Sequence, residues 1–380
     1  MPATKTLIID DAIPYAEAMF QHLGNVKLIP GKEINADHAK QADALIIRSR
    51  TQINSQLLNN SKVSFVGSTV VGLDHIDQPY LKEKAIHFYS AQGCNANSVA
   101  EYIITCLLIM AEKHQFDLSK KTLGIIGVGN VGNLVFKKAQ ALGMKCLLND
   151  PPKVQQHPEL SKTYTDLTQC LTADILTFHT PLTSTGDFPT QDLLSASRLK
   201  TIQPHQIIIN AARGGIINEA AWSQTKTLCN IIDCWVNEPN INESLYRQAD
   251  IATPHIAGHS LDAKIAGTQM VYQQLCQYWQ VPTQDTWKQA LPEPPNPIQI
   301  TTTGNLQSQL MEVTQRTHNP LIDDAAIRSS KMADLHEKYE DYRRNFPIYR
   351  EWRQHKITLK NEKNLYNTLI KLGFEEINNI

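Results

Sequence analysis

Three charged side chains stand where predicted β-strands give way to loops. Arg213 follows an apolar run and precedes two glycines, while Glu238 and His255 each lie next to a proline. An imidazole beside a carboxylate is suited to proton transfer, because the carboxylate fixes the tautomer and favours the imidazolium. A guanidinium can hold a substrate carboxylate and polarise a neighbouring carbonyl. Taken singly, each residue is more often a surface charge or a loop corner, so the hypothesis of a catalytic trio depends on what precedes them.

What precedes them is the glycine-rich turn Gly127-Val-Gly-Asn-Val-Gly132, between a predicted strand at 123–126 and a predicted helix at 133–142. The first glycine allows a tight turn, the second lets the backbone approach a pyrophosphate, and the third lets the helix pack closely on the strand. The start of the helix offers free N–H groups to the phosphates. The predicted contacts of this motif with a dinucleotide are Gly127, Gly129, Asn130, Val131 and Gly132. The alternative, a purely structural turn, is disfavoured by the flanking strand and helix.

Asp150 ends the next predicted strand, where a carboxylate would accept hydrogen bonds from both ribose hydroxyls of NAD. The same charge would repel the 2′-phosphate of NADP, so the sequence predicts NAD as the cofactor. Lys153 lies close by and would soften this preference, but we expect Pro151 and Pro152 to direct it away.

The elements that must position these residues form two alternating series of strand-like and helix-like segments. Such alternation is typical of parallel sheets covered by helices. A long buried helix, with Ser98 and Glu101 in capping-box spacing, separates the two series. Five prolines between 281 and 300 mark a boundary before the tail, whose end has a β–α–β pattern. The predicted strands are 7–9, 44–47, 65–66 and 86–89 in the first series, 123–127, 145–149, 175–179, 207–210, 231–233 and 251–253 in the second, and 356–360 and 374–377 in the tail.

Composition limits the range of partners. The chain has 380 residues, 42% of them hydrophobic, and its 36 basic and 37 acidic residues nearly cancel. This composition supports several cores and provides no global field for nucleic acid. No stretch is apolar for long enough to span a membrane. The seven cysteines include no C-x-x-C pair, which indicates reduced thiols and the cytoplasm. We therefore expect no nucleic-acid partner, no membrane association and no bound metal.

As an ordered set, the motifs resemble the NAD-dependent D-2-hydroxyacid dehydrogenases. The resemblance implies hydride transfer from C2 of a 2-hydroxy acid to NAD, with Arg213, Glu238 and His255 as the catalytic residues. The matching pieces are Gly127–Gly132, Asp150, His179-Thr-Pro-Leu182, Asn210-Ala-Ala-Arg-Gly214, Asp233-Cys-Trp-Val-Asn-Glu-Pro239 and Thr253-Pro-His-Ile-Ala-Gly258. The further cofactor contacts that it implies are Thr180, Ala211, Arg213, Asp233 and Gly258.

Other motifs resemble one branch of that family, which oxidises a phosphorylated four-carbon 2-hydroxy acid in vitamin B6 biosynthesis. They include Asp10-Asp-Ala-Ile-Pro-Tyr15, Ile47-Arg-Ser-Arg-Thr51, Gly72-Leu-Asp-His-Ile-Asp77 and Lys371-Leu-Gly-Phe374. The resemblance implies substrate contacts at Ser49, Val70 and His259. Val70 and His259 depart from the threonine and tyrosine that are usual there, so Val70 would contribute only its backbone N–H and His259 a ring donor.

The pattern and the resemblance together predict an α/β fold with two doubly wound parallel-sheet domains. A Rossmann cofactor domain, 95–257, would be inserted in a flavodoxin-like substrate domain, 1–94 and 258–280, with the active site in the cleft between them. A C-terminal α+β domain, 281–380, would form a homodimer.

The substrate phosphate needs a cation, and two groups of arginines are candidates. Arg48 and Arg50 flank Ser49, whereas Arg343, Arg344 and Arg350 lie in the tail, which a dimer would carry to its partner's site. A solvated face is as good an interpretation of the tail arginines. Two other functions stay open: a 2-hydroxyacid dehydrogenase acting on glycerate or phosphoglycerate, and an NAD-sensing binding module.

Overall fold

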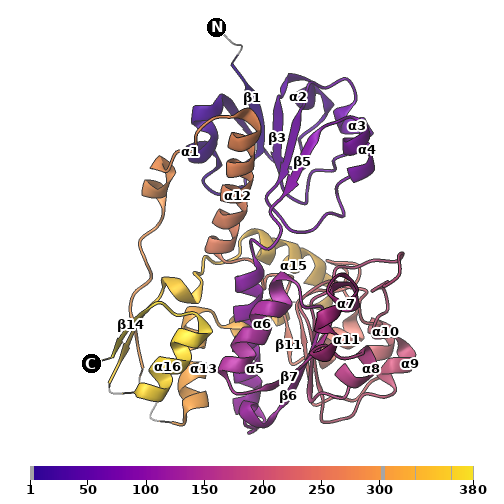
Figure 1. Ribbon diagram of the computed structural model, residues 1–380, viewed down its shortest axis with the longest axis vertical. Helices are drawn as coiled ribbons and strands as arrows, with labels where there is room; N and C mark the ends of the chain where they lie inside the picture. Colours follow the sequence, from indigo (N-terminus) through magenta and orange to yellow (C-terminus); the bar gives the residue numbers. More distant parts are fainter. Residues whose placement is uncertain (1–3, 301–303, 330, 361, 380) are drawn as a thin grey trace. The chain divides into compact units, whose positions relative to one another are not determined.

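The computed structural model describes residues 4–300, 304–329, 331–360 and 362–379, and its contacts divide the chain into two units (Figure 1). Unit 1 comprises Met1–Asn95 and Leu261–Glu293, and unit 2 comprises Ala96–Ser260 and Pro294–Ile380. The three domains expected from the sequence remain a prediction. The two units differ from these domains in two respects. Residues 294–380 belong to the same unit as the glycine-rich turn at 127–132, and so do Gly258 and His259, which we expected in the substrate domain.

Unit 1 is built on a parallel five-stranded sheet with the order β2-β1-β3-β4-β5, the doubly wound order expected. Apolar side chains fill both faces of its central strands, because helices cover both sides. In β1, Leu7 and Ile9 join one hydrophobic cluster and Ile8 joins the other. The strands are β1 (Thr6–Asp10), β2 (Asn25–Ile29), β3 (Ala44–Ile47), β4 (Phe65–Ser68) and β5 (His87–Ser90).

Two sets of helices cover this sheet, one on each face (Figure 1). Helix α12 packs closely on β4, and a Cβ at Gly267 would overlap the carbonyl oxygen of Thr69. The close approach brings the first turns of α12 to the end of β4. The helices are α1 (Ala16–Phe20) and α12 (Leu261–Trp279) on one face, and α2 (Ala36–Gln41), α3 (Ser55–Leu58) and α4 (Gln78–Glu83) on the other.

Unit 2 contains a parallel six-stranded sheet with the order β11-β10-β9-β8-β6-β7, and all six strands predicted for the second series are confirmed. The strand order reverses at β6, so the carboxyl ends of β6 and β8 form the edge at which open α/β sheets bind ligands. The strands are β6 (Thr122–Ile126), β7 (Lys145–Asn149), β8 (Ile175–Phe178), β9 (Ile207–Asn210), β10 (Cys229–Ile232) and β11 (Ile251–Ala252).

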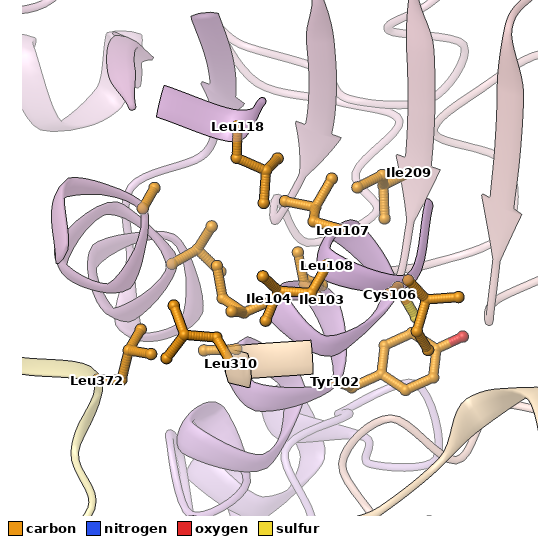
Figure 2. Close-up of a cluster of buried hydrophobic side chains, with 14 of the residues drawn as sticks. Tyr102, Ile103, Ile104, Cys106, Leu107, Leu108, Leu118, Ile209, Leu310 and Leu372 are labelled. Atoms are coloured by element: carbon orange, nitrogen blue, oxygen red, sulfur yellow. The ribbon is translucent and has the colours of Figure 1, made fainter. Parts of the chain in front are cut away.

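One face of this sheet is covered by α5 (Ala96–Lys113) and α6 (Asn130–Ala141), which the tail covers in turn. Figure 2 shows Leu310 of α13 and Leu372 of α16 packed beside α5, with Ile209 of β9 in the same cluster. The tail therefore completes the core of unit 2. Its elements are β12 (Ile298–Gln299), α13 (Leu306–Thr317), β13 (Lys356–Leu359), α16 (Lys363–Leu372) and β14 (Glu376–Asn379), and its strands form a small parallel sheet in the order β12-β13-β14.

The other face of the sheet packs against short helices and against two helices of the tail. Ile327 of α14 and Tyr339 of α15 are buried in this second cluster together with Trp235. The helices on this face are α8 (Leu167–Cys170), α9 (Ala196–Leu199), α10 (Glu219–Trp222), α11 (Glu243–Gln248), α14 (Pro320–Arg328) and α15 (Leu335–Arg344), while α7 (Pro151–Gln156) follows β7 and has no buried residue.

The capping box expected at Ser98 and Glu101 is wrong, although the helix is present. The Ser98 hydroxyl instead contacts the Ser260 hydroxyl and donates to Glu351 Oε1 at 3.1 Å. Glu101 accepts from the backbone N–H of Trp352 at 3.1–3.2 Å. These buried side chains attach α5 to the tail, which lies about 250 residues further along the sequence.

All seven cysteines are free thiols. Over the part of the chain that the structure describes, every helix is too short or too polar to cross a membrane.

Candidate active site

His255 and Glu238 form a hydrogen-bonded pair, as the sequence predicts. The Glu238 oxygens lie 2.9 and 3.2 Å from His255 Nδ1, and Oε1 also accepts from the Trp235 N–H at 2.8 Å. Burial raises the pKa of Glu238, but His255, the Trp235 N–H and Arg343 outweigh it and hold that pKa below its ordinary value. The Glu238 carboxylate is therefore charged at neutral pH. Its bond to Nδ1 leaves Nε2 as the ring nitrogen that can exchange a proton with a ligand.

The backbone around this pair is held in an unusual conformation. Asn237 and His255 both have left-handed backbones, with φ of 59° and 57°. Non-glycine residues rarely adopt this conformation, and where they do the surrounding structure must enforce it.

Asp233 holds the His255 loop in this conformation through hydrogen bonds. Its carboxylate is 1% exposed and accepts from the N–H groups of Ile256 and Ala257 at 2.8 and 3.0 Å. It also accepts from the Thr253 hydroxyl at 2.7 Å, and the Asp233 carbonyl accepts from the His255 N–H at 2.8 Å. The structure thus uses the Asp233 side chain to shape the loop, and its predicted contact with the cofactor stays a prediction.

Arg213 lies just past the end of β9, on a loop tied to the Glu238 loop. The Asn210 side chain donates to the carbonyls of Arg213 and Cys234 at 2.9 and 3.3 Å. A Cβ at Gly214 would overlap the Trp235 carbonyl, so only glycine permits this approach. Among the described residues Arg213 forms no ion pair, and its guanidinium donates only to the carbonyl of Ala212 at 2.7 Å. Its charge is available to an anionic ligand.

Glu219 is a titratable group beside the pair that the sequence analysis missed. Its side chain is buried, and Oε1 accepts from the Val236 N–H at 2.7 Å. Burial raises the pKa of Glu219 to about 7; the nearby charge of Glu238 adds to the rise and the Val236 N–H opposes it. It carries no motif, so only the tertiary contact reveals it.

Cys234, Glu238 and His255 place possible metal ligands within 4.8 Å of one another. Burial, followed by the charges of Asp233 and Glu238, raises the pKa of the Cys234 thiol well above its ordinary value. A cysteine binds a metal ion as its thiolate. The neutral thiol favours an acid–base pair over a metal site, and the expectation of no metal stays a prediction.

The glycine-rich turn has the geometry that a dinucleotide needs. Gly127 has a φ of 86°, and a Cβ there would lie 2.8–2.9 Å from the backbone of His179 and Thr180. A Cβ at Gly132 would overlap the Gly127 carbonyl, whereas one at Gly129 would meet no atom within 4 Å. Gly129 therefore faces open space at the start of α6, where the free N–H groups of the helix can bind phosphate.

Asp150 and Lys153 both contact this turn. Asp150 Oδ2 accepts from the Val128 N–H at 2.8 Å, and Oδ1 accepts from the Lys153 N–H at 3.1 Å. Lys153 Nζ donates to the Val128 carbonyl at 2.9 Å. The expectation that the two prolines direct Lys153 away is therefore wrong, since they begin α7 and its first turns bring the side chain back.

The remaining predicted cofactor contacts lie at strand ends of unit 2. The Thr180 hydroxyl is buried with no hydrogen-bond partner among the described residues, as expected for a group awaiting a ligand. Ala211 follows β9, and Gly258 follows the loop shaped by Asp233. Their contacts with the cofactor stay predictions.

The predicted substrate residues Ser49 and Val70 belong to unit 1. Ser49 is exposed after β3, and the Val70 carbonyl accepts from the Ser90 hydroxyl at 2.9 Å. Their contacts with the substrate stay predictions. The neighbouring Arg48 donates to both oxygens of the fully buried Asp10, at 3.0 and 3.1 Å, so its charge is paired.

His259 belongs to unit 2, and its ring meets that of Phe346 edge-on at 5.9 Å. The predicted substrate contact therefore packs against the tail, just beyond the end of α15.

Comparison with known proteins places these residues in a family. Residues 109–257 match the description "D-isomer specific 2-hydroxyacid dehydrogenase, NAD binding domain". The chain is 60% identical over 377 residues to a protein of Hydrogenovibrio crunogenus described as erythronate-4-phosphate dehydrogenase, covering 99% of this chain and 100% of that protein. A protein of Ruthia magnifica with the same description is 47% identical, over 92% of this chain and 97% of its own length.

The fold is similar to that of solved dehydrogenases. The crystal structure of D-lactate dehydrogenase from Aquifex aeolicus, complexed with NAD and lactic acid, has a TM-score of 0.57 and 19% identity, over 73% of this chain and 96% of its own length. This similarity bears on the fold alone.

Proposed function

The chain belongs to the erythronate-4-phosphate dehydrogenases, among the D-isomer specific 2-hydroxyacid dehydrogenases, and on that premise we propose that it oxidises 4-phospho-D-erythronate with NAD. The product is (R)-3-hydroxy-2-oxo-4-phosphooxybutanoate, on the way to pyridoxal 5′-phosphate, vitamin B6. The observation that carries the proposal is the Glu238–His255 pair at the ligand-binding edge of the unit 2 sheet. Two full-length relatives with this name support it over a glycerate or phosphoglycerate enzyme. Retention of the acid–base pair and of Arg213 argues against a pure NAD sensor.

His255 acts as the base in the oxidation. Its Nδ1 is bonded to the Glu238 carboxylate, so its Nε2 takes the proton of the C2 hydroxyl. Glu238 stabilises the imidazolium that forms, and the Asp233 contacts keep the loop of His255 in place.

Arg213 holds the substrate carboxylate and the C2 oxygen. Its charge is unpaired among the described residues, and a guanidinium offers two parallel N–H groups to a carboxylate. In the reverse reduction, negative charge develops on the C2 oxygen as the hydride adds to C2; Arg213 stabilises this charge and the protonated His255 donates its proton to the oxygen. Ser49, the Val70 backbone and His259 are the proposed further contacts of the substrate.

Residues of unit 2 would hold the dinucleotide. The turn from Gly127 to Gly132 and the start of α6 fit its pyrophosphate, and Asp150 fits the ribose hydroxyls. Thr180, with its buried and unpartnered hydroxyl, fits a further contact. Bound NAD supplies the acceptor for the C2 hydride.

We also propose a cytoplasmic homodimer formed through the tail. Ile322 and Ile348 of the tail are 63% and 78% exposed, and a contact with another copy would remove this apolar surface from water. The seven free thiols support a reducing compartment.

The test is an NADH absorbance assay on the purified full-length protein with 4-phospho-D-erythronate, D-erythronate, D-glycerate and 3-phospho-D-glycerate. We expect the highest kcat/KM with 4-phospho-D-erythronate. A higher value with either glycerate compound would overturn the proposed substrate, and no turnover of any of the four would overturn the enzymatic function.

A further inference from the structure

Helix α15 of the tail lies against both loops that carry site residues. Tyr339, on one face of the helix, is 1% exposed and packs in the same cluster as Trp235, three residues before Glu238. Phe346, just past the end of the helix, contacts the ring of His259 at 5.9 Å. The helix thus runs from the Glu238 loop toward the His259 loop.

Arg343 lies between these two contacts. It follows Tyr339 by four residues, which places both side chains on the same face of α15. Arg343 also interacts electrostatically with the pair. Burial raises the pKa of Glu238, the charge of His255 lowers it, and the charge of Arg343 adds a smaller lowering effect. The guanidinium therefore lies close enough to Glu238 of its own chain for their charges to interact.

Among the residues that the structure describes, none accepts a hydrogen bond from this guanidinium. Its Nε is buried and makes no hydrogen bond within the described ranges, and Arg343 forms no ion pair there. The Tyr339 hydroxyl, buried one turn earlier, is likewise unpartnered among those residues. Buried donors without acceptors are unfavourable, and two of them side by side are typical of a site that an anion completes.

We propose that Arg343 binds the phosphate group of the substrate within its own chain. The inference rests on the proposed function, in which Arg213 takes the carboxylate and the phosphate at the other end needs a second cation. A guanidinium matches the oxygens of a phosphate monoester through two parallel N–H groups. Arg48 is the less suitable candidate, because its charge is already paired with buried Asp10.

The first experiment measures kcat/KM for 4-phospho-D-erythronate and D-erythronate in the wild type, Arg343→Gln and Arg343→Lys. Lys338→Gln is the matched control, since it removes one positive charge from α15 at a position off the Tyr339–Arg343 face. We expect Arg343→Gln to lose about 30-fold or more for the phosphorylated substrate, mainly through KM, and less than about threefold for erythronate. Arg343→Lys recovers part of the loss, and Lys338→Gln keeps the wild-type ratio.

Equal losses for both substrates in Arg343→Gln would overturn the proposal. If Arg343 served only to keep Glu238 ionised, its removal would also move the acidic limb of the pH profile to higher pH for both substrates. No loss for either substrate would overturn it as well.

A second measurement separates this proposal from the proposed function. If the wild type does not oxidise 4-phospho-D-erythronate, the proposed function is wrong. The phosphate site is then tested separately, by calorimetric titration of inorganic phosphate into the NADH-loaded wild type and into NADH-loaded Arg343→Gln. Binding that weakens about tenfold or more in the variant supports the phosphate site. Equal binding, or none in either protein, overturns it.

Discussion

The Nδ1 atom of His255 lies 2.9 Å from Glu238 Oε2, in a loop whose backbone is fixed by Asp233. The pair determines which ring nitrogen faces the substrate. We expect His255→Ala to abolish turnover while NADH binding, measured by fluorescence titration, changes by less than about threefold, because the imidazole contacts the substrate hydroxyl.

Glu238→Gln should retain some activity, with a shifted pH profile. Without the carboxylate, protonation of His255 becomes less favourable, so the basic limb for reduction of the 2-oxo acid moves to lower pH. The profile of kcat/KM is measured between pH 6 and 10, with Glu243→Gln, an exposed residue of α11, as the control. An unchanged basic limb would remove Glu238 from proton transfer.

Asp150 and Lys153 should act in opposite directions on cofactor choice. Asp150→Asn keeps an oxygen that can accept from the Val128 N–H but removes the charge that repels a 2′-phosphate. We expect the ratio of kcat/KM for NADP to that for NAD to rise about tenfold or more in Asp150→Asn, and to fall in Lys153→Gln. Equal use of NADP and NAD by the wild type would contradict the role given to Asp150.

Two glycines of the turn should respond differently to the same substitution. Gly132→Ala forces a methyl group onto the Gly127 carbonyl, so we expect it to lower stability by about 1–3 kcal/mol. Gly129→Ala meets no atom within 4 Å, so its melting temperature stays near that of the wild type while NADH affinity falls. Differential scanning fluorimetry and a binding titration measure the two effects. Undiminished NADH affinity in Gly129→Ala would count against pyrophosphate binding there.

Glu219 should make stability depend on pH. Burial raises its pKa to about 7 from 4.5, so the folded state holds the proton more tightly than the unfolded state. The stabilisation is complete below about pH 4.5 and is lost as the pH rises through about 7. Glu219→Gln cannot ionise and so does not lose this stabilisation. Its free energy of unfolding relative to that of the wild type should therefore be higher at pH 8.5 than at pH 5, by at most about 3 kcal/mol. Urea unfolding at the two pH values measures it, and an equal effect at both would rule out ionisation of Glu219 in this range.

The proposed dimer is best tested on the surface of the tail. Deleting the tail would expose the core of unit 2 that Leu310 and Leu372 help to fill, so the deletion should be insoluble for reasons unrelated to dimerisation. Ile348→Asp, at a side chain 78% exposed, should leave the fold intact and weaken the dimer. Sedimentation velocity across a concentration series measures this; an unaltered dimer would place the interface elsewhere.

The sequence predicted the elements whose signals are local. All six strands of the larger sheet of unit 2 and the glycine turn were found, because apolar runs and turn residues identify them within a few positions. Strand β2 was missed, since its residues are mostly exposed and Asn25 and Lys27 interrupt the apolar pattern at the edge of the sheet. Its parallel register with β1 becomes visible only in the folded chain.

Contacts between distant segments could not be predicted. Ser98 has the spacing of a cap, yet its hydroxyl is taken by Glu351, some 250 residues away. Likewise, no local pattern distinguishes Arg343 from the exposed Arg344 beside it, because the difference depends on what α15 packs against. The acid–base pair was predictable because its two residues occupy motifs that each stand at the end of a strand.

The order of segments along the chain has a consequence for synthesis on the ribosome. One face of the sheet of residues 6–90 is covered by α1 and α12, and α12 begins only at Leu261. The nascent amino-terminal segment therefore keeps part of that apolar face uncovered while the next 170 or so residues are made. At about 5–20 residues per second, that delay is on the order of ten seconds. Unit 2 waits as well, since Leu365 and Phe374 of its core are made more than 100 residues after the last strand of its six-stranded sheet. Both units therefore reach their final form only after a segment distant in the sequence has been made, and until then the exposed sheet face is a natural substrate for chaperones.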